Sequence, residues 1–290
     1  MVFAVLIILA LLFPQTVQAQ SIPLSFQLMM AFRPSTSITI IPIVTPTPAS
    51  KVLGISTTQP SPISTPTNVG GEGKMVTIAV LGDSMIDTLG AGIPSLTKAL
   101  QPSFPLIKFN ILNYGYGASN IEQALDRLSH SYTYRGNTVP DLISQQPDIV
   151  IIESFAYNNF GNSQIGFDRQ WTALGSLTGT IHQLLPSTHI MIAATIAPNS
   201  ISFANGSTTQ FSSLQKVEKT STIKLYLENA INFAKSEKYP FIDAYHPSIF
   251  GGNGNANYIN TSDHIHPSTL GAKFFADLAA KAIVNTHWLD

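Results

Sequence analysis

Residues 75–84 read MVTIAVLGDS, a short apolar run that ends in glycine, aspartate and serine. The apolar part is rich in β-branched side chains, which predicts a buried strand. A serine directly after such a strand stands on a turn that lifts its hydroxyl out of the sheet, where the amides of a following helix can receive an anion. The tripeptide Gly82-Asp83-Ser84 is also ordinary turn and helix-capping chemistry, so alone it leaves both interpretations open.

The chain beyond this strand alternates between strand and helix patterns. Apolar strand-like runs recur at residues 106–112, 148–153, 189–195 and 240–243, with helical patterns at residues 92–100, 119–128, 167–185, 214–235 and 267–284. Near-continuous apolar strands separated by helices indicate an α/β domain whose parallel sheet is covered on both faces. Ligands in such folds bind beyond the carboxyl ends of the strands, so the residues that follow strands are the first candidates for a site.

Composition narrows the classes of function. The 290 residues include 15 Lys or Arg and 16 Asp or Glu, a formal net charge of −1, which lacks the basic excess of a nucleic-acid-binding protein. Hydrophobic residues make up 44%, enough to build a sizeable core. Cysteine is absent, so disulfides, thiolate metal sites, iron–sulfur clusters and cysteine nucleophiles are excluded together.

The amino-terminal residues have the pattern of an export signal. Residues 2–13 are all apolar, a run shorter than the roughly 20 residues that span a bilayer as a helix. Val17 and Ala19 supply small side chains at −3 and −1 of a cleavage site, although no Lys or Arg precedes the apolar run. We predict a signal peptide or amino-terminal membrane anchor at residues 1–19, and hence an extracellular or cell-surface protein. A buried helix of the domain is the alternative.

A linker is predicted between this leader and the folded domain. Ser, Thr and Pro account for 21 of the 35 residues from 33 to 67. Proline at this density prevents helices and central strands and favours extended chain. We therefore assign residues 20–73 to a disordered linker and residues 74–290 to the folded domain.

A second polar cluster lies near the carboxyl terminus, where residues 262–267 read SDHIHP. The carboxylate of Asp263 can hold one imidazole nitrogen of His266 while the other nitrogen faces a hydroxyl. A helix cap with solvent-facing histidines is the plain alternative. A metal site of Asp263, His264 and His266 is a further rival, but the sequence shows no additional ligand cluster.

Two other turns follow predicted strands. Residues 113–119 read NYGYGAS, and a glycine such as Gly117 lets a backbone N–H approach a substrate oxygen. Residues 153–159 read ESFAYNN, where the amide of Asn158 can donate a second hydrogen bond to an oxyanion. Either turn alone could be a plain loop. Their order along the chain, serine, glycine, asparagine and then Asp-x-x-His, is the informative feature.

With these four blocks in order, residues 75–284 resemble the SGNH (GDSL-type) hydrolase family. The resemblance implies a flavodoxin-like three-layer α/β/α sandwich with a five-stranded parallel sheet. It also implies ester hydrolysis without a cofactor, with Ser84 as nucleophile, His266 as base and Asp263 as its orienting acid. The family's oxyanion hole then corresponds to the Ser84 and Gly117 amides and the Asn158 side chain.

The match departs from the family at two blocks. The spacing of the second block differs by one residue from the commonest pattern, so Gly115 and Ala118 remain alternatives to Gly117. The third block is usually Gly-x-Asn-Asp, but Ala156 and Asn159 replace its glycine and aspartate. These differences bear on how a substrate fits.

The expected activity is that of an exported serine esterase that acts on short-chain or acetyl esters of polysaccharide or cell-wall glycan. Its expected partner is this ester substrate, without nucleic acid, and residues 1–19 provide a membrane tether if they are retained. The alternatives are a lipid esterase, a glycan O-acyltransferase and a catalytically silent carbohydrate-binding module on the same fold. The polar residues 253–260 are candidates for sugar contact. The sequence does not indicate an oligomeric state.

Overall fold

The computed structural model describes residues 73–290. The predicted leader at residues 1–19 and almost all of the predicted linker at residues 20–73 lie outside the described residues. Within residues 73–290, no helix is both long and apolar enough to cross a membrane.

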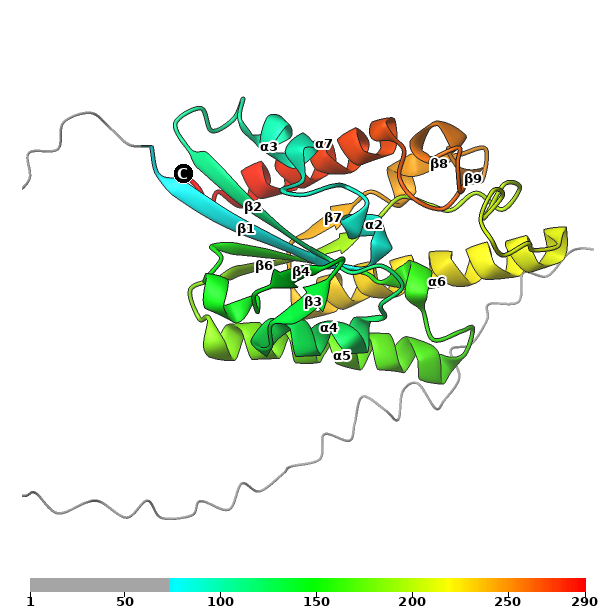
Figure 1. Ribbon diagram of the computed structural model, residues 1–290, viewed down its shortest axis with the longest axis horizontal. Coiled ribbons are helices and arrows are strands. Elements are labelled where there is room, and N and C mark those ends of the chain that lie inside the picture. The colour runs from blue at the N-terminus through cyan, green and yellow to red at the C-terminus, as the bar shows by residue number, and fades with distance from the viewer. Residues whose placement is uncertain (1–72) are drawn as a thin grey trace, which may run out of the picture. The chain divides into compact units, whose positions relative to one another are not determined.

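A parallel sheet of five strands lies at the centre of the described domain (Figure 1). Its strands are β1 (Met75–Gly82), β2 (Lys108–Gly115), β5 (Ile149–Glu153), β6 (His189–Ala194) and β7 (Phe241–Asp243). They lie side by side in the order β2-β1-β5-β6-β7, and every pair is parallel. This is the flavodoxin-like strand order: β2 is added on one side of β1, and β5, β6 and β7 are added on its other side. The predicted fold class is confirmed.

Helices cover both faces of the sheet and complete three layers (Figure 1). The helices α3 (Pro94–Leu100) and α7 (Thr269–Thr286) lie on one face. The other face is covered by α4 (Ile121–Ser129), α5 (Gln164–Leu184) and α6 (Ser213–Glu237). Capping boxes begin two of these helices, since Asn120 and Gln123 start α4 and Ser212 and Gln215 start α6.

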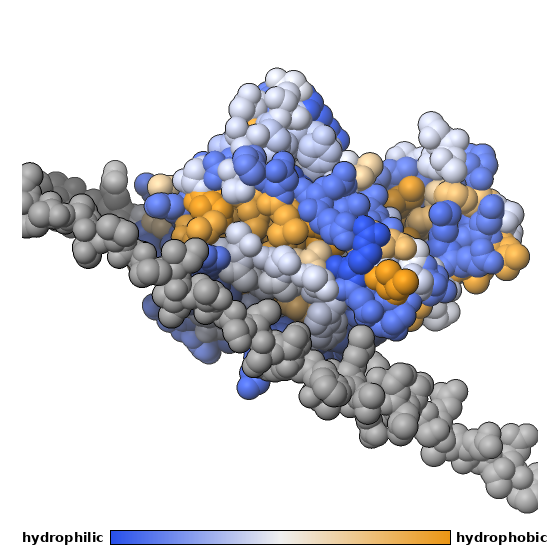
Figure 2. Space-filling view, turned by 90° about the horizontal axis from the view of Figure 1, so that it is seen from below, coloured by the Kyte–Doolittle hydropathy of each residue, from blue (hydrophilic) through white to orange (hydrophobic). Residues whose placement is uncertain are grey.

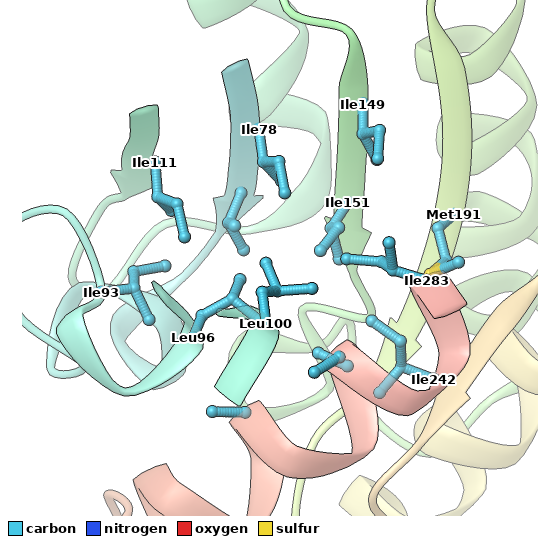
Figure 3. Close-up of a cluster of buried hydrophobic side chains, with 14 of the residues drawn as sticks. Ile78, Ile93, Leu96, Leu100, Ile111, Ile149, Ile151, Met191, Ile242 and Ile283 are labelled. Atoms are coloured by element: carbon cyan, nitrogen blue, oxygen red, sulfur yellow. The ribbon is translucent and has the colours of Figure 1, made fainter. Parts of the chain in front are cut away.

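The two cores alternate along each strand because successive side chains of a strand point to opposite faces. Ile78 and Val80 of β1 belong to the core beneath α3 and α7, part of which is shown in Figure 3. Ala79 and Leu81 belong to the core beneath α4, α5 and α6. All four side chains are fully buried, and each large aliphatic one contributes about 1.5–3 kcal/mol to folding. The central strands are therefore apolar on both faces, as the run from residue 75 to 81 indicated.

The surface of the α4–α5 layer mixes polar and apolar residues. Figure 2, viewed from that side, shows hydrophobic residues in groups separated by hydrophilic ones. A shallow cavity of about 390 Å³ lies between the two helices, lined by residues that include Glu122, Ile165 and Arg169. An ion pair of 2.6 Å between Arg169 and Glu122 joins α5 to α4 across this cavity.

The second predicted strand was placed too early in the chain. β2 begins at Lys108 and runs through Gly115, because Leu106 is 81% exposed and Tyr114 pairs with Leu81 in the sheet. Residues 113–115, expected in a turn, are thus the end of the strand. The side chain of Asn113 still serves the next turn, since it donates to the carbonyls of Ile86 and Gly90.

Several short elements were not predicted. They are the helix α2 (Ser84–Asp87), the hairpin of β3 (Tyr132–Tyr134) and β4 (Asn137–Val139), and the hairpin of β8 (Ile249–Phe250) and β9 (Asn253–Gly254). Elements of two to four residues are too short to show a period. The two residues of the β3–β4 turn, Arg135 and Gly136, both have positive φ, as a two-residue hairpin turn requires. Gly136 is therefore the feature of the sequence that is typical of this turn.

Candidate active site

Ser84 and Asn158, both singled out in the sequence, follow β1 and β5, the two neighbouring strands at which the strand order changes direction. Ser84 is the first residue of α2, directly after β1, and Asn158 lies in the short 3₁₀ turn (Ala156–Asn158) after β5. Asp83 caps α2 by accepting a hydrogen bond of 2.8 Å from the amide of Met85. The crevice between β1 and β5 is where open α/β sheets bind ligands.

These residues line one cavity with a volume of about 1300 Å³. Ser84, Gly117, Ala118, Asn158 and His266 all border it, although they come from four separate parts of the chain. The cavity is larger than the roughly 300–1000 Å³ of most small-molecule sites. It therefore has room for a group considerably larger than a single acetyl ester.

Asp263 and His266 form a hydrogen-bonded pair at the edge of this cavity. The Nδ1 atom of His266 lies 2.8 Å from Oδ2 of Asp263, and the other carboxylate oxygen accepts from the amides of Ile265 and His266. Partial burial opposes ionisation of Asp263, but these hydrogen bonds outweigh it and lower its pKa. The carboxylate is therefore charged at neutral pH and fixes the orientation of the imidazole.

Ser84 borders the cavity. Among residues 73–290, its hydroxyl has no hydrogen-bond partner, and in particular it makes no hydrogen bond to His266. Such a bond in a catalytic pair is commonly long or poorly aligned until substrate binds. The amide of Ser84, the first of α2, likewise has no acceptor in the described part of the chain, as expected for the first amides of a helix.

A second Asp-x-x-His-Pro sequence, residues 243–247, was not singled out in the sequence. Asp243 bonds the Nδ1 atom of His246 at 2.8 Å, the same arrangement as in the pair above. Here, however, Nε2 of His246 is occupied by Glu228 of α6 at 2.7 Å. His246 is thus held between two carboxylates outside the cavity, whereas His266 borders the cavity with Ser84. Position and the free nitrogen distinguish His266 as the candidate base.

We expect the His246 cluster to make stability depend on pH. Partial burial disfavours the imidazolium, but the hydrogen bond and charge of Asp243 and the charge of Glu228 outweigh this and raise the pKa of His246. Its stabilising contribution is therefore full below the unfolded pKa of about 6.5 and is lost as pH rises through the folded pKa. Since the side chain is 47% exposed, solvent screening keeps each ion pair to about 0.2–1 kcal/mol.

Urea unfolding at pH 5.5 and pH 8.5 tests this expectation. The substitution His246→Gln should lower the free energy of unfolding at the lower pH and change it little at the higher one. The control is His130→Gln, because Asp126 is the one carboxylate that pairs with His130 among residues 73–290, and the His130 side chain is more exposed. An equal loss at both pH values, or a larger one at pH 8.5, contradicts the assignment.

Two buried carboxyl groups lie at the ends of β1 and β5, close to Ser84. Asp83 and Glu153 are both fully buried, and burial raises the pKa of each. The charge of Asp83 raises the pKa of Glu153 further. Hydrogen bonds from Met85 and Asn158 favour the charged form of Asp83, so we infer that Glu153 carries the proton of the pair. One oxygen of Glu153 accepts from the Ser154 hydroxyl at 2.6 Å.

Asp83 also fixes the amide of Asn158. The Nδ2 atom of Asn158 donates to Oδ2 of Asp83 at 2.8 Å. Because the carboxylate can only accept, this contact sets which end of the amide carries nitrogen. One N–H of the amide is used in this way, which leaves the second for a group in the cavity.

Gly117, predicted to donate the second backbone hydrogen bond to an oxyanion, has its N–H occupied in this structure. The amide donates to the hydroxyl of Tyr134 at 3.0 Å. The neighbouring Ala118 has a positive φ of 58° and borders the cavity. Its amide has no hydrogen-bond acceptor among residues 73–290. Of the alternatives that the sequence left open, Ala118 has an available N–H. That the Gly117 N–H donates to an oxyanion remains an untested prediction.

Gly115, the third alternative, has a different role. Its N–H is not available to a substrate because it donates to the side-chain oxygen of Asn113 at 2.8 Å. A Cβ at this position would lie 2.1 Å from the amide nitrogen of Asp87, so glycine is needed where β2 passes α2.

A buried arginine, also missed in the sequence, holds the ends of β1 and β2 in place. Arg127 of α4 donates to the carbonyl oxygens of Gly82 and Tyr114 and to the hydroxyl of Ser119. It is 4% exposed. Gly82 stands two residues before Ser84, and Tyr114 stands two residues before the turn at residues 116–119, so Arg127 holds the backbone that leads into each.

His264 does not join the Asp263–His266 pair in a metal site. Its Nδ1 atom lies 2.7 Å from the carbonyl oxygen of Asn205. Across the part of the chain that the structure describes, no group of three or more His, Cys, Asp or Glu residues is arranged to hold a metal ion.

Comparison with solved structures finds the same fold at low sequence identity. A lipase/acylhydrolase from Enterococcus faecalis matches 73% of this chain and 96% of its own, at 18% identity and a TM-score of 0.50. An acetylxylan esterase from Geobacillus stearothermophilus matches 76% and 98%, at 16% identity and a TM-score of 0.50. A protein assigned to the G-D-S-L lipolytic family, from Desulfitobacterium hafniense, matches 71% and 99%, at 12% identity and a TM-score of 0.50.

The chain has an SGNH-type hydrolase fold. No protein-family model matches the sequence, and no curated protein matches it. The match to solved structures covers the described domain and confirms the fold that the resemblance implied.

The two departures in the third block have structural explanations within this SGNH-type fold. Ala156 is fully buried in a core cluster. Asn159 braces the loop that follows, because its side chain donates to the carbonyl of Ala156 and accepts from the amide of Gly161. Asn159 therefore secures the loop that carries Asn158.

The polar residues 253–260 were candidates for sugar contact, but the cavity that Ser84 borders is lined by other residues. Asn253 bonds both the amide and the hydroxyl of Ser200. Asn255 caps the following 3₁₀ turn by accepting from the amide of Asn257. These side chains hold two loops together.

Proposed function

We propose that this protein is a serine esterase that hydrolyses acyl esters through Ser84, His266 and Asp263. The observation that carries the proposal is the cavity beyond the ends of β1 and β5 in an SGNH-type fold. Ser84 borders this cavity together with the imidazole of His266, which is hydrogen-bonded to Asp263. The solved structures with this fold include a lipase/acylhydrolase and an acetylxylan esterase.

In the proposed mechanism, Nε2 of His266 takes the proton of the Ser84 hydroxyl as Oγ attacks the ester carbonyl carbon. The tetrahedral oxyanion accepts hydrogen bonds from the amides of Ser84 and Ala118 and from the free N–H of Asn158. His266 then gives its proton to the departing alcohol as the ester C–O bond breaks. Water attacks the acyl-enzyme in the same way, and the carboxylic acid leaves with Ser84 restored.

Acetylated or short-chain acylated glycan is the substrate class that we favour. The cavity is large, and many of its lining side chains carry hydroxyl or amide groups suited to sugar hydroxyls, among them Thr88, Asn162, Ser207, Thr208, Thr209, Ser221 and Thr222. We infer from residues 1–19 that the protein is exported, which would bring the domain to glycan outside the membrane.

Lipid esters are the second candidate, and a specific observation favours them. The same cavity is bordered by Phe203, Phe211, Val217, Ile223 and Ile265, which offer apolar contacts to an acyl chain. A chain longer than acetyl would bury more apolar surface against these side chains, at about 0.8 kcal/mol for each methylene group.

A hydrolysis screen tests the proposal and separates the two candidates. Purified protein is assayed on aryl esters of two to twelve acyl carbons and on acetylated xylo-oligosaccharide, with Ser84→Ala as the control. A glycan esterase should prefer the acetylated oligosaccharide and the shortest acyl chain, whereas a lipid esterase should prefer longer chains. If the wild-type protein is no faster than Ser84→Ala on every ester, the proposed function is wrong.

A further inference from the structure

The hairpin of β3 and β4 lies outside the main sheet and reaches the candidate active site through its tip. The ring of Tyr134, the last residue of β3, stacks on Tyr116 with ring centroids 4.2 Å apart. Tyr116 directly precedes Gly117 in the second-block turn. The hairpin therefore packs against the turn whose amides border the cavity.

The hydroxyl of Tyr134 bridges two walls of that cavity. It donates to Oδ2 of Asp87 at 2.9 Å and accepts from the amide of Gly117 at 3.0 Å. Asp87 ends α2, the helix that Ser84 begins, and both Asp87 and Gly117 border the cavity. The Tyr134 hydroxyl thus connects α2, which begins at Ser84, to the turn at residues 116–119.

The turn that receives this hydrogen bond is strained. The amide of Ser119 bonds the carbonyl of Tyr116 at 3.3 Å, which closes a four-residue turn. Its third residue is Ala118, with a φ of 58°, while Gly117 before it is not in the left-handed region. This is the pattern of a type II turn, which favours glycine at the position that alanine occupies here. Such a conformation persists only where the surroundings hold it.

We propose that Tyr134 is a positioning residue that holds the 116–119 turn so that the amide of Ala118 faces the oxyanion. The inference rests on the proposed function. The Tyr134 hydroxyl holds the N–H of Gly117, the residue before Ala118, and it also bonds Asp87 of α2. The turn is thereby tied to α2. The Ala118 N–H and the Ser84 hydroxyl then keep a constant separation, and a small displacement of either would weaken transition-state stabilisation.

The substitution Tyr134→Phe tests the proposal, because it keeps the stack on Tyr116 and removes both hydrogen bonds. We expect kcat for an aryl acetate to fall by about 10–100-fold, while KM changes by less than about threefold. Inhibition by phenylboronic acid, which forms a tetrahedral adduct on an active serine, should weaken by a factor similar to the loss in kcat.

Tyr114→Phe is the matched control. The Tyr114 hydroxyl donates to the carbonyls of Pro140 and Asp141, at the base of the hairpin and away from the cavity lining. This variant loses a hydroxyl that tethers the same hairpin but leaves the turn intact. It should keep kcat and the boronic acid affinity within about twofold of wild type even if its Tm falls.

A measurement that needs no substrate tests the same contact. Hydrogen exchange in a peptide covering residues 116–119 should be faster in Tyr134→Phe than in wild type, and unchanged in Tyr114→Phe. Unchanged exchange overturns the proposal whatever the activity. So does a loss confined to KM, which would mean that Tyr134 contacts the substrate directly.

These outcomes distinguish the positioning proposal from the proposed function. If the wild-type protein hydrolyses esters and Tyr134→Phe is equally active, only the positioning role is wrong. If no ester is hydrolysed faster than by Ser84→Ala, the proposed function fails, and the exchange experiment still decides whether Tyr134 holds the turn.

Discussion

Ser84→Ala and His266→Ala should each lower kcat for ester hydrolysis by about 10⁴-fold or more, and the double variant should be scarcely worse than either single one. Ser84 provides the oxygen that attacks the ester, and His266 provides the base that accepts its proton, so removing either group stops the same step. Asp263→Ala should cost less, because an imidazole without its carboxylate still reaches a productive orientation part of the time. The measurement is steady-state kinetics on one aryl acetate.

The second Asp-x-x-His-Pro sequence supplies a matched control for this experiment. His246 has the same contact with an aspartate three residues before it, but it is bonded to Glu228 and lies outside the cavity. His246→Ala should therefore leave kcat within about twofold of wild type. If His246→Ala abolishes activity and His266→Ala does not, the two pairs have been assigned the wrong way round. Multiplicative losses in the Ser84/His266 double variant would contradict a shared step.

Much of the fold could be predicted because the central strands are buried on both faces. The run at residues 75–81 is apolar except at Thr77, so no alternating polar side obscures its assignment. The start of β2 was missed because Leu106 is apolar yet 81% exposed, so hydropathy alone extended the strand past its true limit. The β3–β4 hairpin was missed because three-residue strands have no period, and their position depends on contacts with Tyr116 and Asp87.

The candidate site divides in a similar way. Side chains whose chemistry is local in sequence, such as Asp263 and His266, could be paired from their spacing alone. The partners of Gly117 and Asn158 could not, because Tyr134 lies 17 residues from Gly117 and Asp83 lies 75 residues from Asn158. The amide of Ala118 became the available donor only when the structure showed that the Gly117 amide is occupied and that Ala118 has a positive φ. Which N–H of a turn faces a cavity depends on such tertiary contacts. The spacing of residues in the sequence does not reveal them.

Asn158→Ala should lower kcat by about 10²–10³-fold, equivalent to about 3 kcal/mol in the activation barrier, with KM nearly unchanged. The negative charge on the substrate oxygen develops only as the tetrahedral intermediate forms, so the second N–H of the amide stabilises the transition state and not the bound ester. Removing the amide also takes away a hydrogen bond to Asp83, which keeps the Met85 amide as a partner.

Asn159→Ala is the control that separates this catalytic role from support of the loop. Asn159 is the adjacent residue, and its amide bonds only backbone groups, the carbonyl of Ala156 and the N–H of Gly161. Its loss should lower Tm and leave kcat per folded molecule within about threefold of wild type. Kinetics and thermal unfolding on the two variants measure both effects. If Asn158→Ala changes KM and leaves kcat intact, its amide binds the ground state, and the oxyanion would then rest on the backbone amides of Ser84 and Ala118 alone.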